Sequence, residues 1–262
     1  MTDEHYLFDE VATDAELARL RLHEQWLDPL SQRYLARVGA TEGMRCLDVG
    51  AGAGSVARWL SQQVGPTGRV VAVDQDTKFL VDLDATVEVR RLNILTDEVE
   101  ENAFDLIHTR TLLGHLSNPR AGLERMVRAL APGGILLSLD DDLGLVSLAG
   151  HPEANLATEL FHRWFDTLKS LEIVDSCLGR TVPGLLAEVG LQDVTAEGTT
   201  LVSRRGDVVH EDHRRAFASV REMVVAKGFD GDAWDRAVAL FEDDEIIYVG
   251  TTMFASWGRK AF

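Results

Sequence analysis

The sequence predicts a doubly wound α/β fold, in which helices cover both faces of a mostly parallel seven-stranded sheet. Between residues 45 and 140, short apolar runs alternate with segments of helical periodicity. A turn with three glycines in five positions, 50–54, joins the first of these runs to a helical segment. Two long strand-like stretches, 192–204 and 245–258, come near the end of the chain. Parallel strands joined by helical crossovers bind their ligands at the carboxyl ends of the strands.

The first 40 residues are expected to form a helical cap. Apolar residues recur at helical spacing between residues 12 and 38. Proline lacks the N–H that continues a helix, and its ring clashes with the preceding turn. We therefore expect two helices in this segment, divided at Pro29.

Residues 41–144 are expected to form the ligand-binding core, because strand and helix signals alternate there regularly. The helix predicted at 121–130 shows the clearest apolar stripe, with Leu123, Met126 and Leu130 along one face. Pro132 and the two glycines after it end that helix. The expected strands are RCLDV (45–49), RVVAVD (69–74), VEVRRLNI (87–94), FDLIHT (104–109) and ILLSLD (135–140), with further helices at 54–64 and 77–82.

Beyond residue 143 the pattern changes. Thr, Val, Ile, Phe and Tyr are frequent in the two long strand-like stretches, which favours an antiparallel hairpin that completes the sheet. Helical inserts near 145–178 and 205–243 are too long for simple connections. We expect them, with the N-terminal helices, to form a lid over the ligand edge, so that 145–262 holds lid helices and final strands of a single globular domain. The helices are predicted at 153–171, 181–189, 210–227 and 231–242.

Composition narrows the choice of partners and compartment. The 262 residues carry a formal net charge of −17, which disfavours nucleic acid and anionic membranes as partners. Cys46 and Cys177 form neither a disulfide framework nor a metal-ligand spacing, and we expect no metal. The segment MTDEHYLFDE lacks the features of a signal peptide, and no apolar run is long enough to cross a membrane. We expect a cytoplasmic monomer or homodimer.

The stretch CLDVGAGAGSVARWL, residues 46–60, predicts a strand, a tight turn and a helix. Bare glycine backbone lets a ligand touch the main chain, and the free N–H groups at the helix start favour anionic groups. A dinucleotide-binding turn has the spacing G-x-G-x-x-G. Here Ser55 stands at the third glycine position after Gly50 and Gly52. The turn therefore either binds a nucleoside without pyrophosphate or merely links the strand to the helix.

Polar residues follow the next two predicted strands. Asp74 ends the second strand, where a carboxylate can accept hydrogen bonds from both hydroxyls of a ribose; the alternative is that it caps the next helix. Gln75 follows and is placed to reach the ribose or the adenine edge. Asn93 and Ile94 end the third strand, where an amide and an apolar side chain suit the edge and the face of an adenine ring. A simple turn is the alternative for Asn93.

Motifs over residues 40–142 resemble those of class I S-adenosylmethionine (SAM) dependent methyltransferases. The stretches that carry the resemblance are LDVGAGAG (47–54), FDLIHTRTLLGHL (104–116) and LAPGGILLSLDDD (130–142). The resemblance implies a Rossmann-like domain with SAM as cofactor and S-adenosylhomocysteine as product. Within the family, the chain is most similar to enzymes that methylate small molecules in bacterial natural-product or quinone-type pathways.

The same resemblance implies which residues hold the cofactor. Asp48 would engage the ammonium of the homocysteine part through water, and the main chain of Gly50 and Gly52 would lie along that part. The backbone of Thr109 and the side chain of Arg110 would face the amino acid group. The predicted set is Asp48, Gly50, Ala51, Gly52, Ser55, Asp74, Gln75, Asn93, Ile94, Thr109 and Arg110.

Methyl transfer from a sulfonium needs little from the protein, because in-line placement of the acceptor and exclusion of water supply most of the acceleration. A general base is optional. His115, which follows the fourth strand, is the candidate base, and a packed histidine is the alternative. Asp140 ends the fifth strand and is expected to contact the acceptor. Tyr6 and Trp26, in the N-terminal part of the lid, either line the acceptor pocket or pack between helices.

The predicted function is transfer of a methyl group from SAM to an O, N or C atom of a small-molecule acceptor. The main alternative is a cyclase or another non-methylating catalyst that retains SAM on the same fold. A nicotinamide oxidoreductase is disfavoured because the third fingerprint glycine is missing. A non-catalytic SAM-binding protein is a further alternative.

Overall fold

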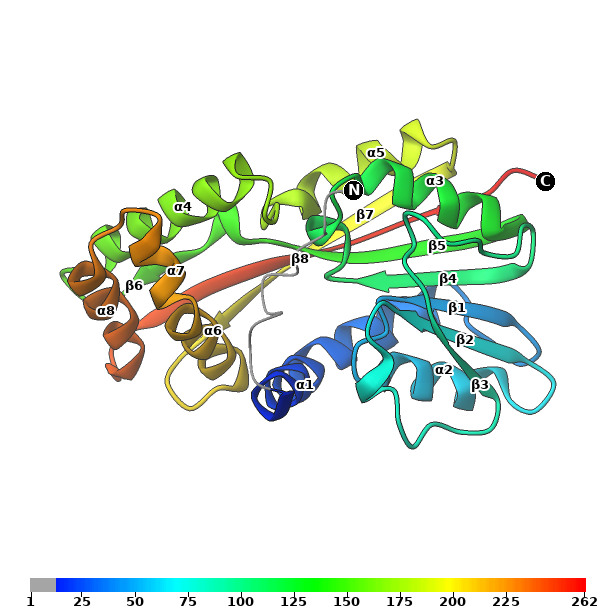
Figure 1. Cartoon of the computed structure of the whole chain (residues 1–262), viewed down its shortest axis with the longest axis horizontal. Coiled ribbons are helices and arrows are strands. Elements are labelled where there is room, and N and C mark those ends of the chain that lie inside the picture. The colour runs from blue at the N-terminus through cyan, green and yellow to red at the C-terminus, as the bar shows by residue number, and fades with distance from the viewer. Residues whose placement is uncertain (1–12) are drawn as a thin grey trace. The chain divides into compact units, whose positions relative to one another are not determined.

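The computed structural model describes residues 13–262. The described chain divides into two compact units, and the chain passes from one unit to the other several times (Figure 1). One unit comprises the chain up to Asp140, Leu178–Glu197 and Phe254–Phe262, and the other comprises Asp141–Cys177 and Gly198–Met253.

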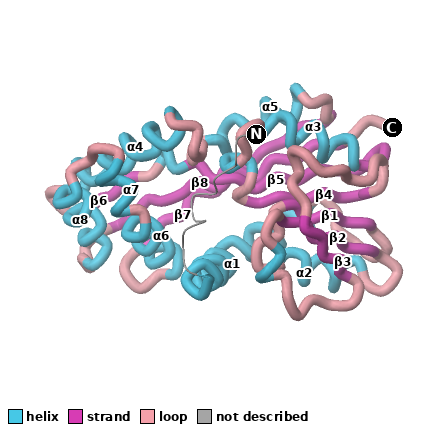
Figure 2. Tube along the Cα trace, viewed as in Figure 1, coloured by secondary structure: helices cyan, strands magenta, loops and turns pink. Residues whose placement is uncertain are grey.

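The first unit is built on five parallel strands, as the sequence predicts. Their order in the sheet is β3-β2-β1-β4-β5, and β8 follows β5 (Figure 2). The order reverses between β1 and β4, which makes the carboxyl ends of these two strands the switch point where α/β folds bind ligands. The strands are β1 (Arg45–Val49), β2 (Arg69–Asp74), β3 (Val87–Arg91), β4 (Phe104–Arg110) and β5 (Leu130–Asp142).

Helices cover both faces of this sheet. α2 (Ser55–Val64) packs on β1 and β2. α3 (Pro119–Ala129) and α5 (Val182–Glu188) contribute to one hydrophobic core in which Leu123 of α3 and Leu47 of β1 are fully buried. Alternate side chains of a strand face opposite sides of a sheet, so the neighbours of Leu47 point toward the other face. This arrangement confirms the predicted doubly wound fold.

α1 spans Thr13–Arg37 as one continuous helix, so the predicted division at Pro29 is wrong. A proline in a helix leaves the carbonyl four residues earlier, here that of Gln25, without its helical N–H. Gln25 and Pro29 both lie on the exposed side of α1, where water can bond to that carbonyl. The other side buries Leu27 and Leu30, and this packing holds the helix together across the proline.

The second unit packs its helices around aromatic rings. Phe161 of α4 stacks on Phe217 of α6 with the ring centroids 4.2 Å apart, and Trp234 of α8 meets Phe161 edge-on at 5.3 Å. Such pairs contribute roughly 0.5–1.5 kcal/mol each beyond their buried area. The helices of this unit are α4 (Ala154–Ser170), α6 (Val208–Ser219), α7 (Arg221–Ala226) and α8 (Gly231–Ala239).

A short strand that the sequence did not reveal, β6 (Ser147–Ala149), brings the described sheet to eight strands instead of seven. β6 pairs antiparallel with β8 (Ile247–Arg259), with Ser147 opposite Val249. A segment this short shows no distinct alternation of apolar and polar residues. β7 (Gln192–Ser203) also pairs with β8, as expected for the closing strands.

Several boundaries differ from the predicted ones. α3 begins at Pro119 and not at residue 121, because the side-chain oxygen of Asn118 caps it by accepting the Ala121 N–H at 3.0 Å. The helix predicted at 77–82 is a single 3-10 turn, η1 (Thr77–Phe79). The helix predicted at 210–227 is divided between α6 and α7. Within the described residues, no helix has the length and apolar character needed to cross a membrane.

Candidate cofactor site

The glycine turn between β1 and α2 has a backbone that only glycine adopts readily. Gly50, Gly52 and Gly54 have φ angles of +74°, +56° and +82°. The N–H groups of Gly50 and Ala51 both donate to the carbonyl of Val73 in β2, at 2.9 and 3.1 Å, which fixes the turn to the neighbouring strand. The turn is therefore rigidly placed at the carboxyl end of β1, where a ligand can contact its main chain.

Asp74, at the end of β2, is bonded to this turn. Its Oδ2 accepts the Gly52 N–H at 2.9 Å, and its Oδ1 accepts the Asp76 N–H at 3.1 Å. Burial raises the pKa of Asp74, while these backbone bonds act in the opposite direction. The cap of η1 is Asp76, whose side chain accepts the Lys78 N–H. The geometry thus assigns helix capping to Asp76 and links Asp74 to the turn, with the exposed Gln75 beside it.

Arg110, at the end of β4, belongs to a polar cluster that includes residues of α1. Its Nη1 donates to Asp28 Oδ1 at 2.9 Å and to Ser31 Oγ at 3.1 Å. Ser55, the first residue of α2, donates its Oγ hydrogen to the same Asp28 oxygen at 2.7 Å and its N–H to Glu24 Oε1 at 3.3 Å. Two predicted cofactor residues, Arg110 and Ser55, therefore lie together.

Sequence reasoning missed Glu24 and Asp28. Both lie on α1, and no local pattern shows that this helix crosses in front of the glycine turn. Carboxylates near the start of α2 are favoured by the partial positive charge of a helix N-terminus. The signal available in the sequence is their spacing of four residues, which places both on one side of α1.

Asn93 and Ile94 follow β3, and each contacts neighbouring parts of the first unit. The Asn93 side-chain oxygen accepts the Leu95 N–H at 2.8 Å, and the Asn93 N–H donates to Asp97 Oδ2 at 2.9 Å, so Asn93 closes a turn. Ile94 is buried and belongs to the hydrophobic core of the first unit. Asn93 remains half-buried, and a contact with adenine stays a prediction for both residues.

A buried polar pair joins β1 to β4. Asp48 Oδ1 lies 2.8 Å from His108 Nδ1, and both residues are almost fully buried. Among the described residues, Asp48 Oδ2, His108 Nε2 and Thr109 Oγ1 have no hydrogen-bond partner. Buried polar atoms without a partner are costly, so a bound water or ligand group that reached one of these atoms would be stabilised. His108 is a further residue that the sequence analysis did not select.

His115 lies in η2 (Leu113–His115), the 3-10 turn after β4. Burial, with a smaller effect of Arg19, lowers the pKa of His115 to about 4. The ring is neutral at physiological pH and can accept a proton, but a group with this pKa is a weak base. The catalytic assignment of His115 stays a prediction.

The three residues predicted to contact the acceptor differ in their surroundings. Asp140 is 1% exposed, and its carboxylate accepts hydrogen bonds from the Leu113 N–H at 3.2 Å and from the Ser138 hydroxyl. Trp26 is buried in α1, with its ring 5.4 Å from that of His23. Tyr6 lies outside the described residues.

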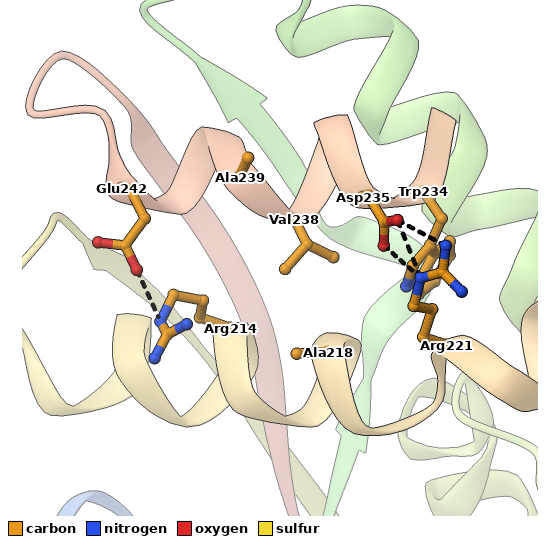
Figure 3. A pocket seen from close by; sticks show the side chains of 8 residues that line it. All are labelled: Arg214, Ala218, Arg221, Trp234, Asp235, Val238, Ala239 and Glu242. Atoms are coloured by element: carbon orange, nitrogen blue, oxygen red, sulfur yellow. Dashed lines mark hydrogen bonds and ion pairs between the residues drawn. The ribbon is translucent and has the colours of Figure 1, made fainter. Parts of the chain in front are cut away.

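A separate hollow of about 250 Å³ lies in the second unit beside α6 and α8 (Figure 3). Its charged residues neutralise one another: Arg221 Nε lies 2.7 Å from Asp235 Oδ1, and Arg214 Nε lies 3.3 Å from Glu242 Oε1. The side chains between these pairs are apolar, as Ala218 and Val238 show. The hollow lacks the convergent polar groups typical of a binding site. In the described part of the chain, no group of three or more His, Cys, Asp or Glu residues is suited to a metal.

Comparison with known proteins identifies the family. Residues 18–196 match the model of a methyltransferase domain. The chain belongs to the methyltransferase-domain family. The methyltransferase str3 of Strobilurus tenacellus is 31% identical over 191 residues, which cover 70% of this chain and 68% of that protein. A demethylmenaquinone methyltransferase of Staphylococcus aureus is 28% identical over 124 residues, which cover 45% of this chain and half of that enzyme.

Solved structures agree with this family at the level of the fold. Phosphoethanolamine N-methyltransferase 2 of Haemonchus contortus, solved with phosphomonomethylethanolamine and S-adenosylhomocysteine, superposes with a TM-score of 0.63 at 19% identity, covering 98% of this chain and 60% of that one. The cyclase SpnF superposes with a TM-score of 0.57 at 20% identity, covering 90% and 82%. The predicted assignment is confirmed: this chain is a class I SAM-dependent methyltransferase.

Proposed function

We propose that this methyltransferase binds one SAM molecule across the carboxyl ends of β1, β2 and β4 and transfers its methyl group to a small-molecule acceptor. The observation that supports this most directly is the bond between Asp74 and Gly52. It places a carboxylate and bare backbone side by side, as a ribose next to a thioether chain requires. Glycines in the left-handed region keep side chains away from that position.

The predicted cofactor residues are assigned here to successive parts of the SAM molecule. Asp74 and Gln75 bind the ribose, and Asn93 with Ile94 contacts the adenine ring. The main chain of residues 50–52 carries the homocysteine part.

Charged groups for the amino acid part of SAM come from β1 and β4. The Arg110 side chain is 13% exposed and its guanidinium is already bonded to Asp28, so it offers a fixed positive charge for the cofactor carboxylate. Asp48 has a carboxylate oxygen without a partner in the described chain, which suits a water that bridges to the ammonium. Ser55 and the backbone of Thr109 complete this end.

The proposed acceptor is a small organic molecule rather than a nucleic acid or a membrane lipid surface. The net charge of −17 opposes a phosphate backbone. Two proteins similar to this chain are named as methyltransferases of small molecules, demethylmenaquinone and phosphoethanolamine. We propose that methyl transfer to an O, N or C atom proceeds mainly by placing the acceptor in line and excluding water. His115, neutral at physiological pH, is the proposed base where one is needed.

Titration calorimetry and mass spectrometry test this proposal. We expect SAM and S-adenosylhomocysteine to bind with about one molecule per chain and NAD not to bind. When SAM is incubated with candidate acceptors, S-adenosylhomocysteine should appear in step with a product heavier by one methylene unit. If the acceptor is transformed and no S-adenosylhomocysteine appears, the result would instead support a non-methylating catalyst. The cyclase SpnF has a similar fold. Binding of NAD without a response to SAM would refute the proposed cofactor site.

A further inference from the structure

Asp140 is a buried carboxylate that, among the described residues, accepts hydrogen bonds from its own strand and from the loop after β4. It is 1% exposed, and it accepts the Leu113 N–H at 3.2 Å and the Ser138 hydroxyl hydrogen. The Leu112 N–H faces the same carboxylate and lowers its pKa. Burying a carboxylate is unfavourable unless donors compensate for the lost water. The position of Asp140 therefore depends on the loop, and the loop depends on Asp140.

This loop is strained at its first residue. Thr111 has a φ of +47°, although a β-branched side chain strongly disfavours the left-handed region. Its N–H donates to the carbonyl of Leu139 at 2.9 Å. β5 thus holds the loop at two successive residues, through the Leu139 carbonyl and the Asp140 carboxylate. A strained conformation persists only where its surroundings fix it in this way.

The loop also sets what lies above the glycine turn. A Cβ atom placed on Gly50 would come within 3.2 Å of both terminal methyl groups of Leu112. Leu112 therefore rests directly on Gly50, in the part of the proposed site that carries the homocysteine chain. Movement of the loop would change the space available to that chain, while Asp74 and the ribose end belong to a different strand.

We infer that Asp140 is a positioning residue, which holds the loop Thr111–Leu113 so that Leu112 shapes the homocysteine end of the cofactor site. The inference rests on the proposed binding of SAM at the glycine turn. It gives Asp140 a role other than the acceptor contact expected from the sequence. His108 of β4, which is paired with Asp48 of β1, is a titratable neighbour that lowers the pKa of Asp140.

The test compares two ligands that differ only in the part near Leu112. S-adenosylhomocysteine carries the homocysteine chain, and adenosine shares its ribose and adenine but lacks that chain. In Asp140→Ala, the Leu113 N–H loses its acceptor. We expect affinity for S-adenosylhomocysteine, measured by calorimetry, to fall about tenfold or more, and affinity for adenosine to change by less than about twofold. Asp140→Asn retains a side-chain oxygen for the Leu113 N–H and should recover most of the lost affinity.

Asp142→Ala is the matched control. Asp142 is also fully buried and its Oδ1 accepts a backbone N–H, that of Gly144, at 3.0 Å. Asp142→Ala should lower the melting temperature as Asp140→Ala does, but it should leave the ratio of the affinities for S-adenosylhomocysteine and adenosine unchanged. If Asp140→Ala does not fold, Ser138→Ala removes one donor to the same carboxylate and should shift the ratio in the same direction. An unchanged ratio of the two affinities in Asp140→Ala, or in Ser138→Ala where Asp140→Ala does not fold, would overturn the inference. Failure of the wild type to bind S-adenosylhomocysteine would instead refute the proposed function.

Discussion

The carboxylates in and around the candidate cofactor site differ in their hydrogen-bond partners, and these partners do not follow from their positions in the sequence. Asp74 and Asp76 are two residues apart, yet Asp74 accepts the Gly52 N–H and Asp76 accepts the Lys78 N–H. Asp48 and Asp140 are both buried, but Asp48 pairs with His108 while Asp140 holds the loop after β4. Residue type alone would assign all four to ligand binding.

Asp74→Ala is predicted to weaken SAM binding by about 2–4 kcal/mol, or about 30- to 1000-fold, because two charge-assisted bonds to the ribose are lost. The Gly52 N–H also loses its acceptor, so we expect a loss of about 1 kcal/mol in the free energy of unfolding without ligand. Asp76→Ala is the control: it removes the cap of η1 with little effect on SAM affinity. Calorimetry and urea unfolding measure both quantities. Equal SAM affinities in the two variants would contradict the ribose assignment.

At the scale of elements, the glycine turn shows how two glycines of similar backbone can differ in their surroundings. Gly50 and Gly52 both lie in the left-handed region. A Cβ on Gly52 would lie 3.6 Å from Leu20, an ordinary contact, whereas on Gly50 it would press on Leu112 at 3.2 Å. Backbone strain therefore acts at both positions, and crowding acts at Gly50.

Gly52→Ala is predicted to lower the free energy of unfolding by about 1 kcal/mol, the cost of a left-handed alanine. Gly50→Ala should lower it by about 2–3 kcal/mol, because crowding against Leu112 adds to the same strain. Urea denaturation of the two variants gives the comparison. Leu112→Ala added to Gly50→Ala should recover the difference in part. Equal losses in the two single variants, with no recovery in the double variant, would show that Leu112 does not rest on Gly50.

For the whole molecule, the two units raise the question of whether they unfold together. His213, in α6 of the second unit, is buried and bonded to the Val209 carbonyl at 2.8 Å and to Thr251 Oγ1 at 2.6 Å. Burial lowers the pKa of His213 below its ordinary value of 6.5. The neutral ring is thus favoured in the folded state, and unfolding takes up a proton at mildly acidic pH.

The stability that neutral His213 provides should be fully present above about pH 6.5 and should decrease as the pH falls toward the lowered pKa. We predict that the difference in unfolding free energy between the wild type and His213→Gln is constant from about pH 7 to 8 and shrinks below about pH 6. Urea unfolding followed by circular dichroism measures it. If the two units unfold together, a single unfolding transition should show the whole pH-dependent difference between the wild type and His213→Gln. Two transitions, with the difference confined to one of them, would show that the units unfold separately. A difference that grows at acidic pH would contradict the lowered pKa.

The sequence by itself determined the features that depend on neighbouring residues. β1 and β2 have the predicted bounds, the glycine turn lies where its spacing indicated, and the order of motifs was enough to identify the family. These features arise from local backbone preferences and from the alternation of buried side chains, which are written in short stretches of sequence.

Tertiary structure decided the partners of those residues. It kept α1 continuous through Pro29, brought Asp28 of α1 to Arg110 of β4, and turned Asp140 toward the loop after β4. Each of these outcomes depends on contacts between segments distant in the sequence, or on which side of a helix meets water. Such contacts reflect the packing of the whole unit, and for that reason no local pattern could reveal them.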